Sequence, residues 1–153
     1  MYSTAHLAAG LIIGKLTGDY PTAIISAVAI DLDHLIPHVK NKIIFNVKEM
    51  LKVAKSTHES SRSYLHSFIA FFALTSLIAL FSLKVGLVFG LGYLSHFLLD
   101  AIDDDDFYPF FPWKKFNTRG FIGYYSKAEL IFTIILFGVY FVVWLRFSPW
   151  LYL

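Results

Sequence analysis

Long apolar stretches, separated by short polar or proline-containing breaks, dominate the chain. The first apolar block covers residues 7–16, and the second covers residues 22–36 and ends at Pro37. Each block is shorter than the ~20 residues that a helix needs to cross the hydrocarbon core of a bilayer. We therefore predict a hairpin of two short helices, which either pack against other helices or dip into the membrane.

Three longer apolar segments follow, at residues 66–83, 85–102 and 128–147. A single residue, Lys84, separates the first two, so these segments predict a tight helical hairpin. The last segment is a predicted C-terminal transmembrane helix, and it ends near tryptophans that are typical of the membrane interface. The pattern predicts an all-α fold: a polytopic membrane helical bundle of about five helical segments, forming a single membrane domain over residues 1–153.

Two polar stretches interrupt this pattern. In residues 39–63, lysines alternate with apolar residues at roughly helical spacing. This is typical of an amphipathic helix on the membrane surface, and an ordinary solvated loop helix fits the residues equally well. Residues 103–127 contain Pro109, Pro112 and Gly120, which predict a loop. Its acidic start, Asp103 to Asp106, is predicted to be a solvated cap.

The composition strengthens the membrane interpretation. The 153 residues are 57% hydrophobic and 16% charged, against ~25% charged residues in soluble domains. The absence of cysteine excludes disulfides, thiolate zinc sites and thiol nucleophiles. A net charge of +2 is too small to indicate a nucleic acid as the main partner, so the lipid bilayer is the expected partner. With no basic residue before the first apolar block, no cleavable signal peptide is predicted.

Basic residues predict how the chain is oriented. The loops at 39–63 and 103–127 carry ten of the thirteen Lys and Arg residues, and the hairpin at Lys84 places both loops on one side. Positively charged loops remain in the cytoplasm during membrane insertion. We therefore predict a multi-pass protein of the cytoplasmic membrane, with both loops in the cytoplasm.

Ionisable residues gather at the predicted cytoplasmic helix ends. Such residues are costly in a membrane and suggest a functional site. Residues three or four apart share one helix face, as His96 and Asp100 do, and as Asp31 and His34 do. Asp33 can join them only if its helix loosens before Pro37. The predicted metal ligands are His6, Asp31, Asp33, His34, His66, His96 and Asp100.

Imidazoles and carboxylates without a thiolate suit a divalent transition metal, Zn²⁺ first, with Mn²⁺ or Fe²⁺ as alternatives. The donors outnumber the needs of one tetrahedral zinc, so one or two ions are expected. A bound metal lowers the pKa of water. Asp33 or Asp100 would then accept the proton, and Arg62 would hold an anionic phosphate, although Arg62 is equally explained as a positive charge of the cytoplasmic loop.

Four short motifs resemble the YdjM-like family of prokaryotic inner-membrane metal-dependent hydrolases, some of which are described as LexA-regulated or LexA-binding. They are Thr4-Ala5-His6, Asp31-Leu32-Asp33-His34-Leu35, Arg62-Ser63-Tyr64-Leu65-His66-Ser67 and Gly92-Tyr93-Leu94-Ser95-His96-Phe97-Leu98-Leu99-Asp100. The resemblance covers roughly residues 1–113 and implies a metal-dependent hydrolase. The chain departs from the family at Ser61, where a histidine is usual, so the contribution of that segment to the ligand set is in question.

The predicted function is therefore a membrane-bound metal-dependent hydrolase that acts on lipid or lipid-linked phosphoesters at the cytoplasmic face. Two alternatives remain open from the residues. A metal ion transporter would place its ligands near the bilayer midplane, whereas these ligands lie at one end. A non-catalytic membrane protein with a structural metal site would have closed coordination. The sequence indicates neither the substrate nor the oligomeric state.

Overall fold

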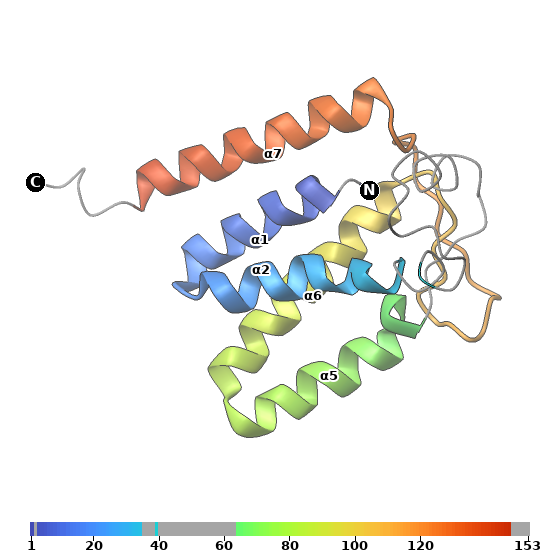
Figure 1. Cartoon of the computed structure of the whole chain (residues 1–153), viewed down its shortest axis with the longest axis horizontal. Helices are drawn as coiled ribbons and strands as arrows, with labels where there is room; N and C mark the ends of the chain where they lie inside the picture. The colour runs from blue at the N-terminus through green and yellow to red at the C-terminus, as the bar shows by residue number, and fades with distance from the viewer. Residues whose placement is uncertain (2, 35–38, 40–63, 148–153) are drawn as a thin grey trace, which may run out of the picture.

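The computed structural model describes residues 1, 3–34, 39 and 64–147, which form an all-helical bundle (Figure 1). Its five α-helices are α1 (Ser3–Thr17), α2 (Tyr20–Val28), α5 (Phe68–Phe81), α6 (Leu83–Ile102) and α7 (Lys127–Arg146). Two short 3₁₀ helices, η1 (Ala29–His34) and η2 (Tyr64–His66), accompany them. The predicted all-α fold with about five helical segments is confirmed. The predicted amphipathic helix at 39–63 lies outside the described residues, Val39 excepted.

Helix α6 lies at the centre of the bundle and packs against α1, α2 and α5. Helix α7 runs along α1 on the outside (Figure 1). Helices α1 and α2 form the predicted hairpin, and α5 and α6 form the second one. The second hairpin turns at Ser82, whose backbone N–H bonds the Ile78 carbonyl while its Oγ accepts from the Val85 N–H. The turn therefore precedes the predicted break at Lys84, because Ser82 caps both helices.

The helices fall into two groups by length: those long enough to cross a membrane and those that are too short. Helices α6 and α7 have 20 residues each and are apolar enough to cross a membrane. Helices α1 and α5 have 15 and 14 residues, short of the ~20 needed for a span. The predicted span at 66–83 is thus shortened, because η2 occupies its start and Ser67 caps α5 by accepting from the Ala70 N–H. The block at 22–36 also divides, since α2 ends at Val28 and η1 follows.

Two glycines allow α2 to fit closely between α1 and α6. A Cβ at Gly10 would lie 3.0 Å from the Ile24 Cα, and one at Gly92 would lie 1.9 Å from the Ser26 Oγ. Gly10 is one helical turn after His6, and Gly92 is one turn before His96. The close approach of the three backbones therefore sets the separation of these two histidines.

The loop between α6 and α7 folds back over the end of α6. The Gly120 N–H donates to the Asp103 carbonyl at 2.7 Å, and the Thr118 N–H donates to the Phe107 carbonyl at 2.8 Å. Gly120 is required by this approach, because a Cβ there would lie 2.0 Å from the Ile102 carbonyl oxygen. The loop consequently covers the helix end at which His96 and Asp100 lie.

Candidate metal centre

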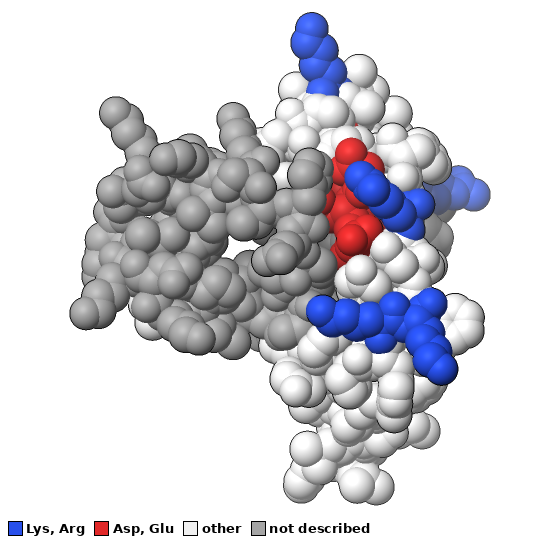
Figure 2. Space-filling model, turned by 90° about the vertical axis from the view of Figure 1, so that its right-hand side faces the viewer, with Lys and Arg blue, Asp and Glu red and all other residues white. Residues whose placement is uncertain are grey.

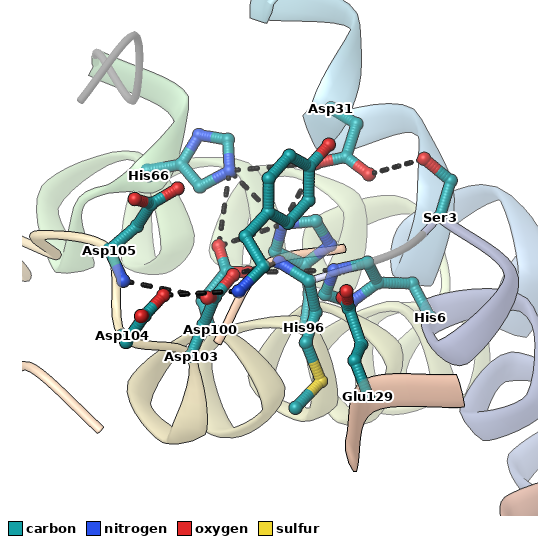
Figure 3. Close-up of polar contacts among 12 residues, drawn as sticks. Ser3, His6, Asp31, His66, His96, Asp100, Asp103, Asp104, Asp105 and Glu129 are labelled. Atoms are coloured by element: carbon teal, nitrogen blue, oxygen red, sulfur yellow. Dashed lines mark hydrogen bonds and ion pairs between the residues drawn. The ribbon is translucent and has the colours of Figure 1, made fainter. Parts of the chain in front are cut away.

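Five of the predicted ligands converge at one end of the bundle (Figure 3). They come from four separate segments: His6 from the first turn of α1, Asp31 from η1, His66 from η2, and His96 and Asp100 from the last turns of α6. The three histidines and Asp100 are buried, while the side chain of Asp31 keeps 18% of its surface exposed. The cluster is therefore shielded from solvent except on the Asp31 side.

The separations between donor atoms suit a shared cation. His66 Nε2 and His96 Nε2 are 3.1 Å apart, and each lies 3.4 Å from Asp100 Oδ2. Asp31 Oδ1 is 3.5 Å from His96 Nε2 and 3.8 Å from His66 Nε2. Metal–ligand bonds of ~2.1 Å place neighbouring donors about 3.0 Å apart in an octahedron and about 3.4 Å apart in a tetrahedron. In two groups of three, His6–His96–Asp100 and Asp31–His66–His96, one donor atom from each residue lies within 4.8 Å of the other two, close enough to hold one metal ion.

Neighbouring groups orient two of these side chains. His96 Nδ1 lies 2.8 Å from the carbonyl oxygen of Ala27, close to the end of α2. A proton on Nδ1 donates to this carbonyl and leaves the Nε2 lone pair directed at the cluster, as in many metal sites. Asp31 Oδ2 accepts a hydrogen bond from Ser3 Oγ at 3.1 Å, which leaves Oδ1 facing His96. The lone pairs at the centre of the cluster are therefore positioned before any ligand binds.

His6 supplies the test of whether a cation fits. Its side chain is fully buried, its ring stacks on that of His96 at 3.8 Å, and its Nε2 lies 3.5 Å from Asp100 Oδ1. Among the described residues, neither ring nitrogen of His6 has a hydrogen-bond partner. Leaving a buried polar group unsatisfied costs about 1–3 kcal/mol. A metal ion would satisfy one of the two ring nitrogens of His6, so the donor set fits a divalent cation.

Asp103 is buried, and the prediction that it belongs to a solvated acidic cap is wrong. Its backbone carbonyl is held by Gly120, and its Oδ2 pairs with the α-amino group of Met1. The same amino group lies 3.4 Å from Asp100 Oδ1. The sequence did contain a signal for this, because Asp103 follows Asp100 by three residues and continues the same helix face.

The remaining predicted site residues are not placed by the structure. Asp33 and His34 belong to η1, but their side chains lie outside the described part of the chain. Arg62 lies outside it as well, together with Ser61. Their roles as ligands, base or phosphate-holding group stay predictions.

A buried carboxylate that the sequence analysis missed lies at the start of α7. Glu129 is fully buried, and its Oε2 accepts from the Tyr125 N–H at 2.7 Å while its own N–H donates to Ser126 Oγ. The Ser-x-x-Glu pattern of a capping box was the available signal. Chiefly because of burial, the pKa of the adjacent Tyr124 is raised above its ordinary value, so its hydroxyl stays protonated at neutral pH. Figure 3 shows Glu129 at the same end as His6.

The surface at this end carries both signs of charge. Figure 2, which views this end of the molecule, shows acidic side chains gathered in one patch, with Lys and Arg side chains above it, at its right edge and below it. The loop residues Lys114, Lys115 and Arg119 are exposed. An anionic molecule approaching this end would therefore meet cationic side chains around the acidic patch.

Comparison with known protein families identifies the chain's family. The model of the family described as YdjM inner membrane protein matches residues 1–152. The resemblance noted over residues 1–113 is therefore confirmed, and it extends through α7. No curated protein and no solved structure match the chain.

Proposed function

The chain belongs to the YdjM inner membrane protein family, and from this membership and the buried cluster we propose that it is a membrane-bound metal-dependent hydrolase. Its cofactor would be a divalent transition metal, Zn²⁺ first and Mn²⁺ or Fe²⁺ otherwise. The observation that carries the proposal is the convergence of five His and Asp side chains from four segments, with donor atoms 3.1–3.8 Å apart.

The chemistry follows from the donor set. A divalent metal would supply Lewis acidity toward water and toward a phosphoryl oxygen. His66 and His96 would hold it through Nε2, with Asp31 and Asp100 contributing carboxylate oxygens. Asp100 is also a candidate general base, as is Asp33. Arg62 is the candidate group for holding the phosphate, because a guanidinium binds phosphate oxygens in pairs.

The surroundings of the cluster support a lipid or lipid-linked phosphoester as substrate. The loop that covers the cluster exposes Phe110, Trp113 and Phe116 beside Lys114 and Lys115. Aromatic and basic side chains together are typical of the headgroup layer of a membrane, where basic residues attract anionic lipids. A phosphoester in that layer would reach the cluster without leaving the membrane.

The same loop supports a cytoplasmic orientation. Its basic residues Lys114, Lys115 and Arg119 lie between α6 and α7, and by the positive-inside rule this side of the membrane would be the cytoplasmic one. We propose a multi-pass arrangement in which α6 and α7 span the bilayer. The cluster would then face the cytoplasm.

A structural metal in a non-catalytic protein is the second candidate. The burial of the three histidines and Asp100 favours it, because structural sites have closed coordination. The partial exposure of Asp31 favours the hydrolase, since it leaves one side of the cluster accessible. Transport is the weakest of the three proposals, because the donors lie at one end of the helices rather than halfway along them.

Metal content and hydrolysis together test the proposal. Detergent-purified wild type is compared with His66→Ala, His96→Ala and the control Asp106→Asn, whose carboxylate accepts from Asn117 in the loop. We expect stoichiometric metal in wild type and control, and a loss of more than ~100-fold in metal affinity in both histidine variants. Absence of metal in wild type purified without chelator would contradict the proposal.

The hydrolysis arm uses membranes. Phosphate release from phosphatidic acid is measured in inverted vesicles and in right-side-out spheroplasts, with p-nitrophenyl phosphate as a soluble comparison. We expect activity on the lipid in inverted vesicles and its loss in His96→Ala. Bound metal without hydrolysis would favour the structural metal, and activity confined to spheroplasts would contradict the orientation.

A further inference from the structure

The α-amino group of Met1 lies next to the candidate metal centre. It is buried, pairs with Oδ2 of Asp103, and lies 3.4 Å from Oδ1 of Asp100. Asp100 is itself a predicted ligand, and its other oxygen, Oδ2, lies 3.4 Å from Nε2 of both His66 and His96. The ammonium group therefore contacts one oxygen of a carboxylate whose other oxygen faces the cluster.

Packing of the Met1 side chain fixes the position of this ammonium group. Only 7% of Met1 is exposed, and it forms an apolar cluster with Ala5, Leu99 and Ile122. These three residues come from α1, from α6 immediately before Asp100, and from the loop that folds over the end of α6. Chain termini are poorly ordered unless the fold holds them, and here three parts of the fold hold Met1.

The charge of the ammonium group balances two buried carboxylates. Asp100 and Asp103 are both buried, and an oxygen of each lies next to the Met1 amino group. Neighbouring carboxylates disfavour each other's charged form, whereas an adjacent cation favours it. Removing one partner of a buried ion pair is strongly unfavourable, because the remaining charge is left uncompensated. The ammonium group therefore favours the charged form of Asp100, which is the form that binds a metal.

The ammonium group also determines which oxygen of Asp100 is presented to a metal. With Oδ1 beside the ammonium, Oδ2 is the oxygen that faces His66 and His96. Asp103 is held in turn, because its Oδ1 accepts a hydrogen bond from the Asp105 N–H at 3.4 Å. Contacts of this kind behind a ligand orient it and tune its metal affinity. A continuous set of contacts thus runs from the loop, through Asp103 and the ammonium group, to Asp100.

An acylated α-nitrogen could not replace the ammonium group. When a formyl group, an acetyl group or a preceding residue is attached, the nitrogen of Met1 becomes a neutral amide with a single N–H donor. That donor cannot serve both Asp100 and Asp103 as a charged ammonium with three donors can. The attached acyl group would also need space beside the buried carboxylate of Asp103.

We propose that the α-ammonium group of Met1 is a positioning group of the metal centre, and that the centre binds its ion tightly only once any N-acyl group or preceding residues have been removed. The inference rests on the proposed function and names a regulation of the same site, namely N-terminal processing. Because Asp100 is both a predicted ligand and a candidate general base, its contact with the ammonium group would affect metal binding and hydrolysis together.

A removable N-terminal extension tests the inference on one and the same protein. The sequence Ile-Glu-Gly-Arg is placed before Met1, so that cleavage by factor Xa regenerates the α-amino group, and intact mass verifies the cleavage. Zn²⁺ affinity is measured in detergent before and after cleavage, beside wild type and a control that carries the same segment after Leu153. We expect an affinity about 10- to 100-fold lower before cleavage. After cleavage, the affinity should equal that of wild type and of the control.

Three outcomes of this titration are decisive. Wild-type affinity in the uncleaved protein would overturn the proposal, because the α-amino group would then be dispensable. A loss that persists after complete cleavage would overturn it as well, since the missing ammonium group would not be the cause. Absence of metal from wild type would instead overturn the proposed function.

The visible absorption spectrum of bound Co²⁺ separates positioning from a purely structural role, because it reports the geometry of the ligands. We expect the spectrum of the Co²⁺-saturated protein to change when cleavage releases the Met1 amino group, since Asp100 would then be reoriented. An unchanged spectrum, with only the midpoint of thermal unfolding shifted, would mean that the ammonium group stabilises the fold without positioning Asp100, and would overturn the proposal.

Discussion

Helices α6 and α7 have the same length and are both apolar enough to cross a membrane, yet they occupy opposite environments. Half of the apolar window of α6 is buried inside the molecule, against 11% for α7. Helix α6 contacts three other helices, whereas α7 packs mainly along α1 and exposes a row of aliphatic residues, namely Ile131, Ile134, Ile135 and Val142. Helix α6 is therefore the central helix of the bundle, whereas α7 presents an apolar face outward.

The residues that distinguish the two helices are small or ionisable. Helix α6 carries Gly86, Gly90 and Gly92, and an added Cβ at each would meet a neighbouring helix. In α7, a Cβ at Gly138 would meet no atom of the described residues within 4 Å. Helices in membranes approach closely through small residues and place polar groups between them. Hydropathy therefore finds both helices, while the glycine contacts and the His96–Asp100 pair identify the helix that carries the site.

The largest effect is expected from Gly92→Ala. The new methyl group would overlap Ser26 Oγ and lie 2.8 Å from the Ala23 carbonyl, so α2 and α6 must separate. Overpacking of this kind costs about 1–3 kcal/mol. Separation would also move the Ala27 carbonyl away from His96 Nδ1, one turn further along. We expect a lower midpoint of thermal unfolding in detergent and a weaker affinity for the metal.

Gly90→Ala is the matched control on the same helix. Its Cβ would lie 2.9 Å from Thr75 Cγ2, which is the end of a side chain rather than backbone. The threonine can rotate, so the cost should be clearly smaller, with metal affinity unchanged. Equal losses in the two variants would contradict the idea that the contact between α2 and α6 positions His96.

A smaller effect is expected from Tyr93→Phe. The Tyr93 side chain is fully buried, and its hydroxyl donates to the Leu65 carbonyl, immediately before His66. Removing the hydroxyl leaves that carbonyl without this donor and costs about 1 kcal/mol. Because the bond holds η2 against α6, metal affinity should fall by about 10-fold. Titration with Zn²⁺ measures the metal affinity, and Tyr64→Phe is the control because the Tyr64 side chain is exposed. Unchanged affinity in Tyr93→Phe would show that packing alone places His66.

Much of the site could be predicted because its residues are ionisable in an apolar sequence. His96 and Asp100 follow from their spacing on one helix, and the common end of the helices brings His6, Asp31 and His66 to them. The fold class follows from the same apolar segments. These features depend on local periodicity and on the number of chain reversals, both of which are visible in one sequence.

The parts that could not be predicted depend on how segments distant in sequence pack together. Asp103 is buried because Gly120, seventeen residues later, lies against the end of α6. Glu129 is buried because α7 lies along α1. The short α5 depends on where Ser67 caps the helix, and a continuous apolar run does not reveal that position. Long-range contacts decided each of these. The local signals, the spacing of Asp103 from Asp100 and the capping-box pattern at Glu129, indicate a shared helix face and a helix start but not that these side chains are buried.

The smallest effect is expected from Gly138→Ala, and its sign differs from that of the others. Alanine is favoured over glycine inside a helix by about 0.5–1 kcal/mol, because glycine loses more backbone freedom on folding. Because no atom in the described part of the chain lies within 4 Å of the new methyl group, no packing cost from these residues opposes this gain. We expect a slightly higher unfolding midpoint and an unchanged metal content, measured beside Gly92→Ala. A loss of stability in Gly138→Ala would mean that this face of α7 packs against protein in the membrane, for example against a second copy of the chain. The contrast between the buried α6 and the exposed α7 would then hold only for the single chain.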